Sequence, residues 1–147
     1  MVIDTLIKLF NRDLNKLKAE ITAYDSETNL WKIDKSITNS SGNLVLHLVG
    51  NLNHFIGSVL GKTGYLRQRE LEFSLKDVPR LELLTQIEET RIMVEQTLKL
   101  LKQQDLQNDY KIEVFKEPMT TEFFLIHLST HLVYHLGQIN YHRRLLT

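Results

Sequence analysis

Four stretches of the chain alternate apolar and polar residues with the period of an amphipathic helix. In the first stretch, apolar residues recur at intervals of three and four from Ile3 to Ile21, with charged and amide side chains between them. At about 3.6 residues per turn, such positions share one helix face. The pattern therefore predicts a first helix over roughly the first two dozen residues.

A second amphipathic stretch follows a connector from Asp25 to Gly42 that is rich in Ser, Asn and Thr. We expect Trp31 and Ile33 to be tucked beneath this connector. The second helix is predicted from about residue 43 to about residue 61. The residues that can cap its first turn are Asn39, Ser40 and Ser41.

The third and fourth stretches are separated from the second by residues 65–78, which are polar and aperiodic. This segment is long enough, when extended, to cross the length of a bundle, so the second and third helices need not be antiparallel neighbours. The third helix is predicted to end near Gln104. Residues 105–118 can hold one short extended segment, after which Thr120 or Thr121 caps the fourth helix.

Four amphipathic helices and no convincing strand predict an all-α four-helix bundle, and 147 residues fit a single domain over residues 1–147. The 18 basic residues balance the 18 acidic ones, so no global field steers the chain to nucleic acid. No apolar run approaches the roughly 18 residues of a membrane span, and charges interrupt the apolar residues near the N-terminus. We expect a cytoplasmic protein that binds neither nucleic acid nor a membrane.

Histidine is concentrated in the predicted fourth helix, which holds four of the six histidines. His127, His131 and His135 are spaced by four, and Gln138 and His142 continue the series within an arc of roughly 80°. Two histidines four apart lie about 6 Å apart along the axis and can share one ion. Because the chain has no cysteine, histidine and carboxylate are its strong transition-metal ligands. The stripe therefore predicts metal-ligand chemistry.

The predicted second helix offers two more histidines, His47 and His54, which share a face with Asn51 between them. With a rise of about 1.5 Å per residue, His47 lies about 10 Å from His54 along the axis. His127 lies about 12 Å from His135 for the same reason. Neither of these pairs can bind one ion, so at most two histidines of the fourth helix and one of the second can converge.

If the second and fourth helices run antiparallel with His47 level with His131 and His135, these three residues form the primary metal site. The same register places His54 level with His127, as a second layer deeper in the cleft. Three neutral imidazoles leave a coordination position open for water or substrate, as in catalytic sites. No Asp or Glu joins the two stripes, so we expect the metal, or a free histidine such as His54 or His127, to manage protons.

Several of these residues have a second interpretation. His54 and His127 can equally be hydrogen-bonded polar groups at the cleft edge. Arg91 lies inside the apolar seam of the third helix, where an arginine usually extends its charge to solvent; in the cleft it would suit an anionic substrate. Gln138 can orient a metal ligand or a bound water, or pair across the helix interface. We expect His142 to interact with the carbonyls at the helix end or with a dimer partner.

The segments HLVGNLNHFIG and HLVYHLGQINYHRRLL resemble the DinB/YfiT-like superfamily of metalloproteins, and the similarity in helix order and loop lengths extends over almost the whole chain. The residues that match the family's H-x-x-x-H-x-G-Q pattern are His131, His135, Gly137 and Gln138. His47 matches the family's histidine near the start of the second helix, whereas His54 is not a usual family ligand. The resemblance implies an up-down-down-up topology, a divalent metal on three histidines and frequent homodimers.

The known activities of this superfamily are thiol-dependent, namely the transfer of bacillithiol or related low-molecular-weight thiols to electrophiles and a mycothiol-dependent isomerisation. The resemblance therefore leads us to expect an S-transferase with a thiol cosubstrate. A metal-dependent hydrolase is a close variant that the sequence does not separate. The alternative from another class is a non-catalytic, dimeric metal-binding or stress-related bundle. We expect zinc or nickel first and iron or manganese next, because imidazole ligands accept several of these ions.

Overall fold

The computed structural model describes residues 1–146, and its regular structure is helical throughout this range. The four long helices are α1 (Val2–Thr22), α2 (Ser41–Leu52), α4 (Arg80–Leu100) and α6 (Thr121–Leu145). The shorter elements are the 3₁₀ turn η1 (Glu27–Trp31), the π-helical turn η2 (Asn53–Ser58), α3 (Arg69–Ser74) and α5 (Gln103–Gln107). The prediction of an all-α fold is confirmed. Along residues 1–146, no helix is long and apolar enough to cross a membrane.

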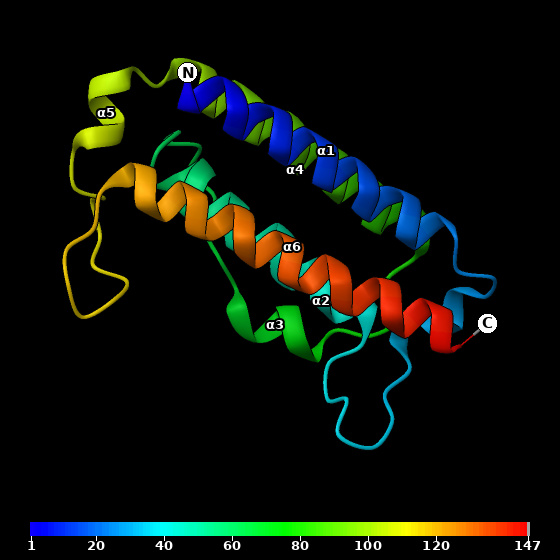
Figure 1. Ribbon diagram of the computed structural model, residues 1–147. Helices are drawn as coiled ribbons and strands as arrows, with labels where there is room; N and C mark the ends of the chain where they lie inside the picture. Colours follow the sequence, from blue (N-terminus) through cyan, green and yellow to red (C-terminus); the bar gives the residue numbers. More distant parts are fainter. Residues whose placement is uncertain (147) are drawn as a thin grey trace.

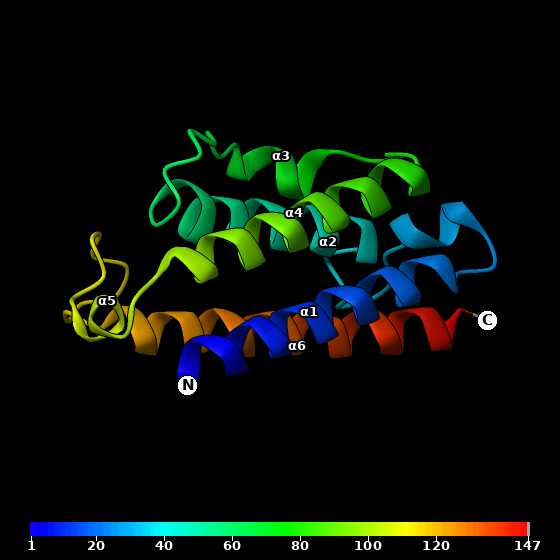
Figure 2. The same cartoon turned by 90° about the horizontal axis from the view of Figure 1, so that it is seen from above.

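The long helices lie side by side as a bundle. In Figure 1, α1 and α6 run from left to right, whereas α2 and α4 run from right to left. Figure 2 shows the same directions from above, with α3 on the outside of the bundle. α1 packs against α4 and α6, while α2 packs against α3, α4 and α6. The contact between antiparallel α2 and α6 is the one that positions the histidines.

The core is built from the apolar positions that the helical period places on one face. On α1 these residues are at most 3% exposed, and they are Leu6, Phe10, Leu14, Leu17 and Ile21. Burying each such side chain contributes about 1.5–3 kcal/mol. The facing stripes of α2, α4 and α6 are buried with them, so the polar edges of α2 and α6 are held at a fixed spacing.

Two of the predicted helix caps are present. The Ser40 hydroxyl accepts a hydrogen bond from the Asn43 amide at 3.2 Å, and the Thr120 hydroxyl accepts one from the Phe123 amide at 3.1 Å. Each hydroxyl satisfies an amide that a helix start leaves unpaired. These caps fix where α2 and α6 begin. They therefore fix the position of each histidine along its helix axis.

The connecting segments differ most from expectation. Residues 65–78 are not simply extended, because α3 forms within them and docks on α2. Ile33 is 58% exposed instead of tucked beneath its connector. Trp31 does pack inward, against Gly42, where an added Cβ would lie 2.7 Å from the indole ring. The predicted third helix ends earlier, at Leu100, and residues near Gln104 belong to α5.

Candidate metal centre

Three histidines from α2 and α6 meet at one point. His47 Nε2 lies 3.2 Å from His131 Nε2, which in turn lies 3.1 Å from His135 Nε2. Candidate ligand atoms of all three residues lie within 4.8 Å of one another. His131 and His135 come from successive turns of α6, and His47 faces them from antiparallel α2. This cluster can hold a metal ion.

Hydrogen bonds to Nδ1 of His47 and His135 determine which ring nitrogen carries the lone pair. His47 Nδ1 donates to Glu72 Oε1 at 3.1 Å, and His135 Nδ1 donates to Gln138 Oε1 at 2.7 Å. A neutral imidazole carries one N–H, so the Nε2 atom of each ring is left with a lone pair. Both atoms face His131 Nε2, at separations close to the roughly 3.3 Å expected between ligands of tetrahedral zinc. The donor set therefore fits a divalent cation.

Glu72 is the carboxylate behind His47, and Arg67 holds it in place. Arg67 donates from Nε to Glu72 Oε2 and from Nη2 to Glu72 Oε1, both at 2.9 Å. Burial opposes ionisation of Glu72, but the hydrogen bonds from His47 and Arg67 outweigh burial and lower its pKa. An ionised carboxylate on the far nitrogen fixes the tautomer and orientation of a metal-binding histidine.

Gly50 leaves the room that Glu72 occupies. An added Cβ at Gly50 would lie 1.9 Å from Glu72 Oε2 and 2.5 Å from Glu72 Cδ. Gly50 follows His47 by three residues on α2, so the bare backbone there lets the carboxylate of α3 reach the imidazole. The expectation that no Asp or Glu joins the histidines is therefore wrong. Gly50, an interior helix glycine, is the sequence signal that could have revealed this close approach.

The environment favours the neutral form of His131 and His135. Burial, together with charge repulsion from the nearby His135 and His47, lowers the pKa of His131 to about 4. Burial also lowers the pKa of His135, although the hydrogen bond to Gln138 opposes this shift. A metal ligand must be deprotonated, so His131 and His135 are ready to bind an ion near pH 7 without releasing a proton.

Cavities lie on two sides of the histidine cluster. The first has a volume of about 370 Å³ and reaches His47 and His131. Its other lining residues are Asn51, Phe55, Arg67, Arg69, Val114, Phe115, Phe124, His127 and Leu128. The second has a volume of about 520 Å³ and reaches His135 and Gln138 between α6 and residues 36–39. Small molecules can therefore approach the cluster from either side.

Of the predicted second layer of His54 and His127, only His127 lines the first cavity. His127 lines the first cavity with its ring against Phe115 and Phe124, at centroid distances of 5.1 and 5.8 Å. His54 instead contacts Phe55 at 4.7 Å. No hydrogen bond or ring contact joins these two histidines, both of which the structure describes. His54 and Phe55 both lie in the π-helical turn η2, and Phe55 is the one that lines the cavity.

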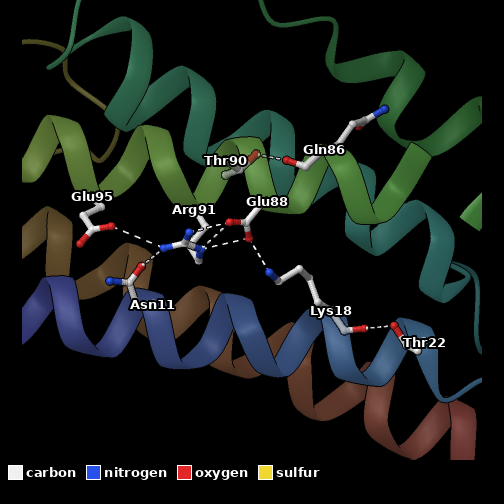
Figure 3. A network of polar contacts seen from close by, with 8 residues as sticks. All are labelled: Asn11, Lys18, Thr22, Gln86, Glu88, Thr90, Arg91 and Glu95. Carbon is white, nitrogen blue, oxygen red and sulfur yellow. Dashed lines mark hydrogen bonds and ion pairs between the residues drawn. The ribbon is translucent and has the colours of Figure 1, made fainter. Parts of the chain in front are cut away.

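Arg91 lies away from the cavities, between α1 and α4 (Figure 3). Its guanidinium pairs with Glu88 and Glu95 of its own helix and donates to Asn11 Oδ1 at 3.1 Å. The contacts with Glu88 raise the pKa of Arg91. The hypothesis that Arg91 meets a substrate in the cleft is therefore wrong, because its donors are used to join two bundle helices.

His142 is a structural residue and not a contact for the helix end or for a partner. It is only 8% exposed. His142 Nε2 donates to the Lys32 carbonyl at 2.8 Å, so Nδ1 accepts from the Tyr24 hydroxyl at 2.6 Å. These bonds tie α6 to the connector after α1. Of the five polar groups on the α6 stripe, His131 and His135 are in the cluster, Gln138 supports it, and His127 faces the cavity.

The fold and the site together define a helical-bundle protein with a three-histidine cluster able to bind a metal ion. The sequence profile of the family described as "Protein of unknown function (DUF1572)" matches residues 3–147. The chain belongs to this family. A search of curated proteins finds no match.

Proposed function

We propose that the protein is a DinB/YfiT-like metalloenzyme with the up-down-down-up topology, which binds one divalent ion on His47, His131 and His135. The proposed reaction is transfer of a low-molecular-weight thiol to a small electrophile, with zinc or nickel before iron or manganese as the ion. The observation that carries this proposal is the convergence of three Nε2 atoms with Glu72 on the far side of His47. Three protein ligands leave a position for a reactant, whereas structural zinc sites use four.

The residues around the cluster suit this reaction. When bound, the ion would supply a Lewis acid that lowers the pKa of a thiol. Glu72 and Gln138 hold His47 and His135 in the tautomers that ligation requires. Phe55, Phe115 and Phe124 line the first cavity with apolar rings.

His127 is the group best placed to take the thiol proton. It lines the same cavity as His47 and His131, and its side chain makes no hydrogen bond within residues 1–146. In the transfer, the sulfur forms a bond to the electrophilic carbon, and the leaving group departs with the electron pair of the broken bond. The thiol proton passes to His127, whose imidazole is the general base.

The exposed face of α6 supports assembly as a homodimer. Large apolar side chains at 45–67% exposure share an arc of roughly 100° along this helix, and they are Phe123, Ile126, Val133, Tyr134 and Tyr141. A second copy that packs the same face against this one would cover them by two-fold symmetry. Sedimentation equilibrium tests this assembly, and a monomer at every concentration would contradict it.

The test of the function joins metal analysis to a transfer assay. Protein purified without a polyhistidine tag is reconstituted with zinc or nickel, and metal content per chain is measured. Adduct formation between a thiol and a chromogenic electrophile is then followed. We expect one ion per chain and transfer by the wild type and by His54→Ala, the matched control, but neither in His135→Ala.

The other outcomes separate the alternatives. Turnover of an ester or amide without thiol would assign hydrolysis instead of transfer. Bound metal without either activity would favour the non-catalytic metal-binding bundle. Absence of metal after reconstitution, or transfer by a metal-free His135→Ala variant, would overturn the proposal.

A further inference from the structure

Two polar atoms beside the histidine cluster are buried without a hydrogen-bond partner. They are Asn51 Oδ1 on α2 and His131 Nδ1 on α6, and both residues line the first cavity. The third such atom within residues 1–146, Arg80 Nε, lies at the start of α4. A buried polar atom usually has a partner, because leaving it unpaired is costly. The two atoms near the cluster therefore need a physical explanation.

Asn51 is positioned to meet His131. It lies one helical turn after His47 on α2, and His47 faces both His131 and His135. Because α2 and α6 run in opposite directions (Figure 1), one turn onward along α2 corresponds to one turn back along α6, beside His131. Asn51 is 7% exposed, and its side chain makes no hydrogen bond to any residue that the structure describes. Its amide can therefore pair with the imidazole.

The tautomer of His131 explains why the two atoms do not pair in the metal-free protein. The Nε2 lone pairs of His47 and His135 lie 3.2 and 3.1 Å from His131 Nε2. A hydrogen on His131 Nε2 makes these contacts favourable, whereas three facing lone pairs would repel one another. A neutral imidazole carries one N–H, so His131 Nδ1 is then an acceptor. Asn51 Oδ1 is also an acceptor, and two acceptors cannot share a hydrogen bond.

Ligation reverses the role of His131 Nδ1. His131 can bind an ion through Nε2 only when the hydrogen has left Nε2, and a hydrogen gained at Nδ1 keeps the ring neutral and makes Nδ1 a donor. We propose that Asn51 is the positioning residue for His131 and that its Oδ1 accepts this Nδ1 hydrogen in the metal-bound protein. Asn51 then acts on His131 as Glu72 acts on His47. The inference rests on the metal site of the proposed function and not on the thiol reaction.

Long-range proton–nitrogen correlation spectra show directly which ring nitrogen of His131 carries the hydrogen. We expect this hydrogen on Nε2 in the metal-free protein and on Nδ1 in the zinc-loaded protein. In the zinc-loaded wild type, the Nδ1 hydrogen should exchange slowly with water because Asn51 accepts it. Asn51→Leu should lose this protection. Asn51→Asp should keep it, since a carboxylate oxygen accepts the same bond. A side chain that only fills space would not produce this pattern.

Zinc affinity and stability together separate positioning from a structural role. Asn51→Leu should lower zinc affinity about 10-fold, and Asn51→Asp should keep the wild-type affinity or exceed it. Asn51→Leu should not lower the urea midpoint of the metal-free protein, because it removes a buried oxygen that has no partner there. Asn53→Leu is the matched control. Asn53 Nδ2 donates to the Val49 carbonyl and the Thr90 hydroxyl at 2.8 and 2.9 Å, so its loss should lower the urea midpoint and leave zinc affinity unchanged.

The outcomes separate this inference from the proposed function. Unchanged zinc affinity in Asn51→Leu, or a His131 hydrogen already on Nδ1 before zinc is added, would overturn the role of Asn51 and leave the metal site intact. Zinc binding with the expected spectra but without thiol transfer would support the role of Asn51 and overturn the proposed reaction. Failure of the wild type to bind zinc would overturn both.

Discussion

Replacing Gly50 by alanine should damage the metal centre without changing any ligand. The added Cβ would lie 1.9 Å from Glu72 Oε2 and 2.5 Å from Glu72 Cδ, well inside van der Waals contact. The carboxylate has to move away, and it then loses its bonds to His47 and Arg67. His47 would no longer be held in the tautomer that leaves Nε2 free.

The magnitude follows from two opposing effects. Breaking a buried ion pair such as Glu72 with Arg67 costs about 3–5 kcal/mol. Alanine is favoured over glycine in a helix interior by about 1 kcal/mol. The net loss in the free energy of unfolding should therefore be about 2–4 kcal/mol. Zinc affinity should fall about 10–100-fold, as expected when the group behind a histidine ligand is lost.

Gly137→Ala is the matched control, because Gly137 lies within α6 between two residues of the site and an added Cβ meets nothing within 4 Å. It should raise stability by up to about 1 kcal/mol and leave zinc affinity unchanged. Urea unfolding of the metal-free variants and zinc competition with a chelating dye measure both quantities. Equal stabilisation by the two substitutions, with equal zinc affinity, would refute the position assigned to Glu72.

Three further predictions address other parts of the molecule. Gln138→Ala should lower zinc affinity about 10-fold in the same competition assay, because the His135 tautomer is no longer fixed; unchanged affinity would exclude that role. Arg91→Gln should cost about 1 kcal/mol in urea unfolding and leave zinc affinity intact, since it joins α1 to α4; loss of zinc would place it in the site. In the metal-free protein, stability should fall as the pH is lowered from about 6.5 to about 4. The unfolded chain binds a proton near pH 6.5 and folded His131 only at about 4. If the stability of the wild type fell no more steeply with pH than that of His131→Leu, the result would contradict this prediction.

The helices and the histidine cluster were accessible from the sequence for physical reasons. Helical period identifies a buried face because every third or fourth residue of α1 and α6 packs inward. The spacing of four between His131 and His135 needs only helix geometry to become a pair of ligands. His47 followed from the antiparallel register, whereas His54, predicted for a second layer, is not among the residues that line the first cavity.

The residues that surround the histidine cluster could not be predicted from the sequence in the same way. Glu72, Arg67 and Arg69 lie in or beside a short helix within a segment that has no apolar period, so no pattern placed them near α2. Their position depends on tertiary docking and on the space left at Gly50. Helical period placed Arg91 in an apolar seam and left two roles open for it. Its carboxylate partners Glu88 and Glu95 on neighbouring turns decide between them.

The most direct test of the account is anomalous diffraction from crystals of the zinc-reconstituted protein. The account predicts one strong peak per chain, about 2.0–2.1 Å from Nε2 of His47, His131 and His135. Glu72 should remain on His47 Nδ1. Absence of a peak at these three atoms, or a peak that uses His54 or His127 in place of one of them, would contradict the account.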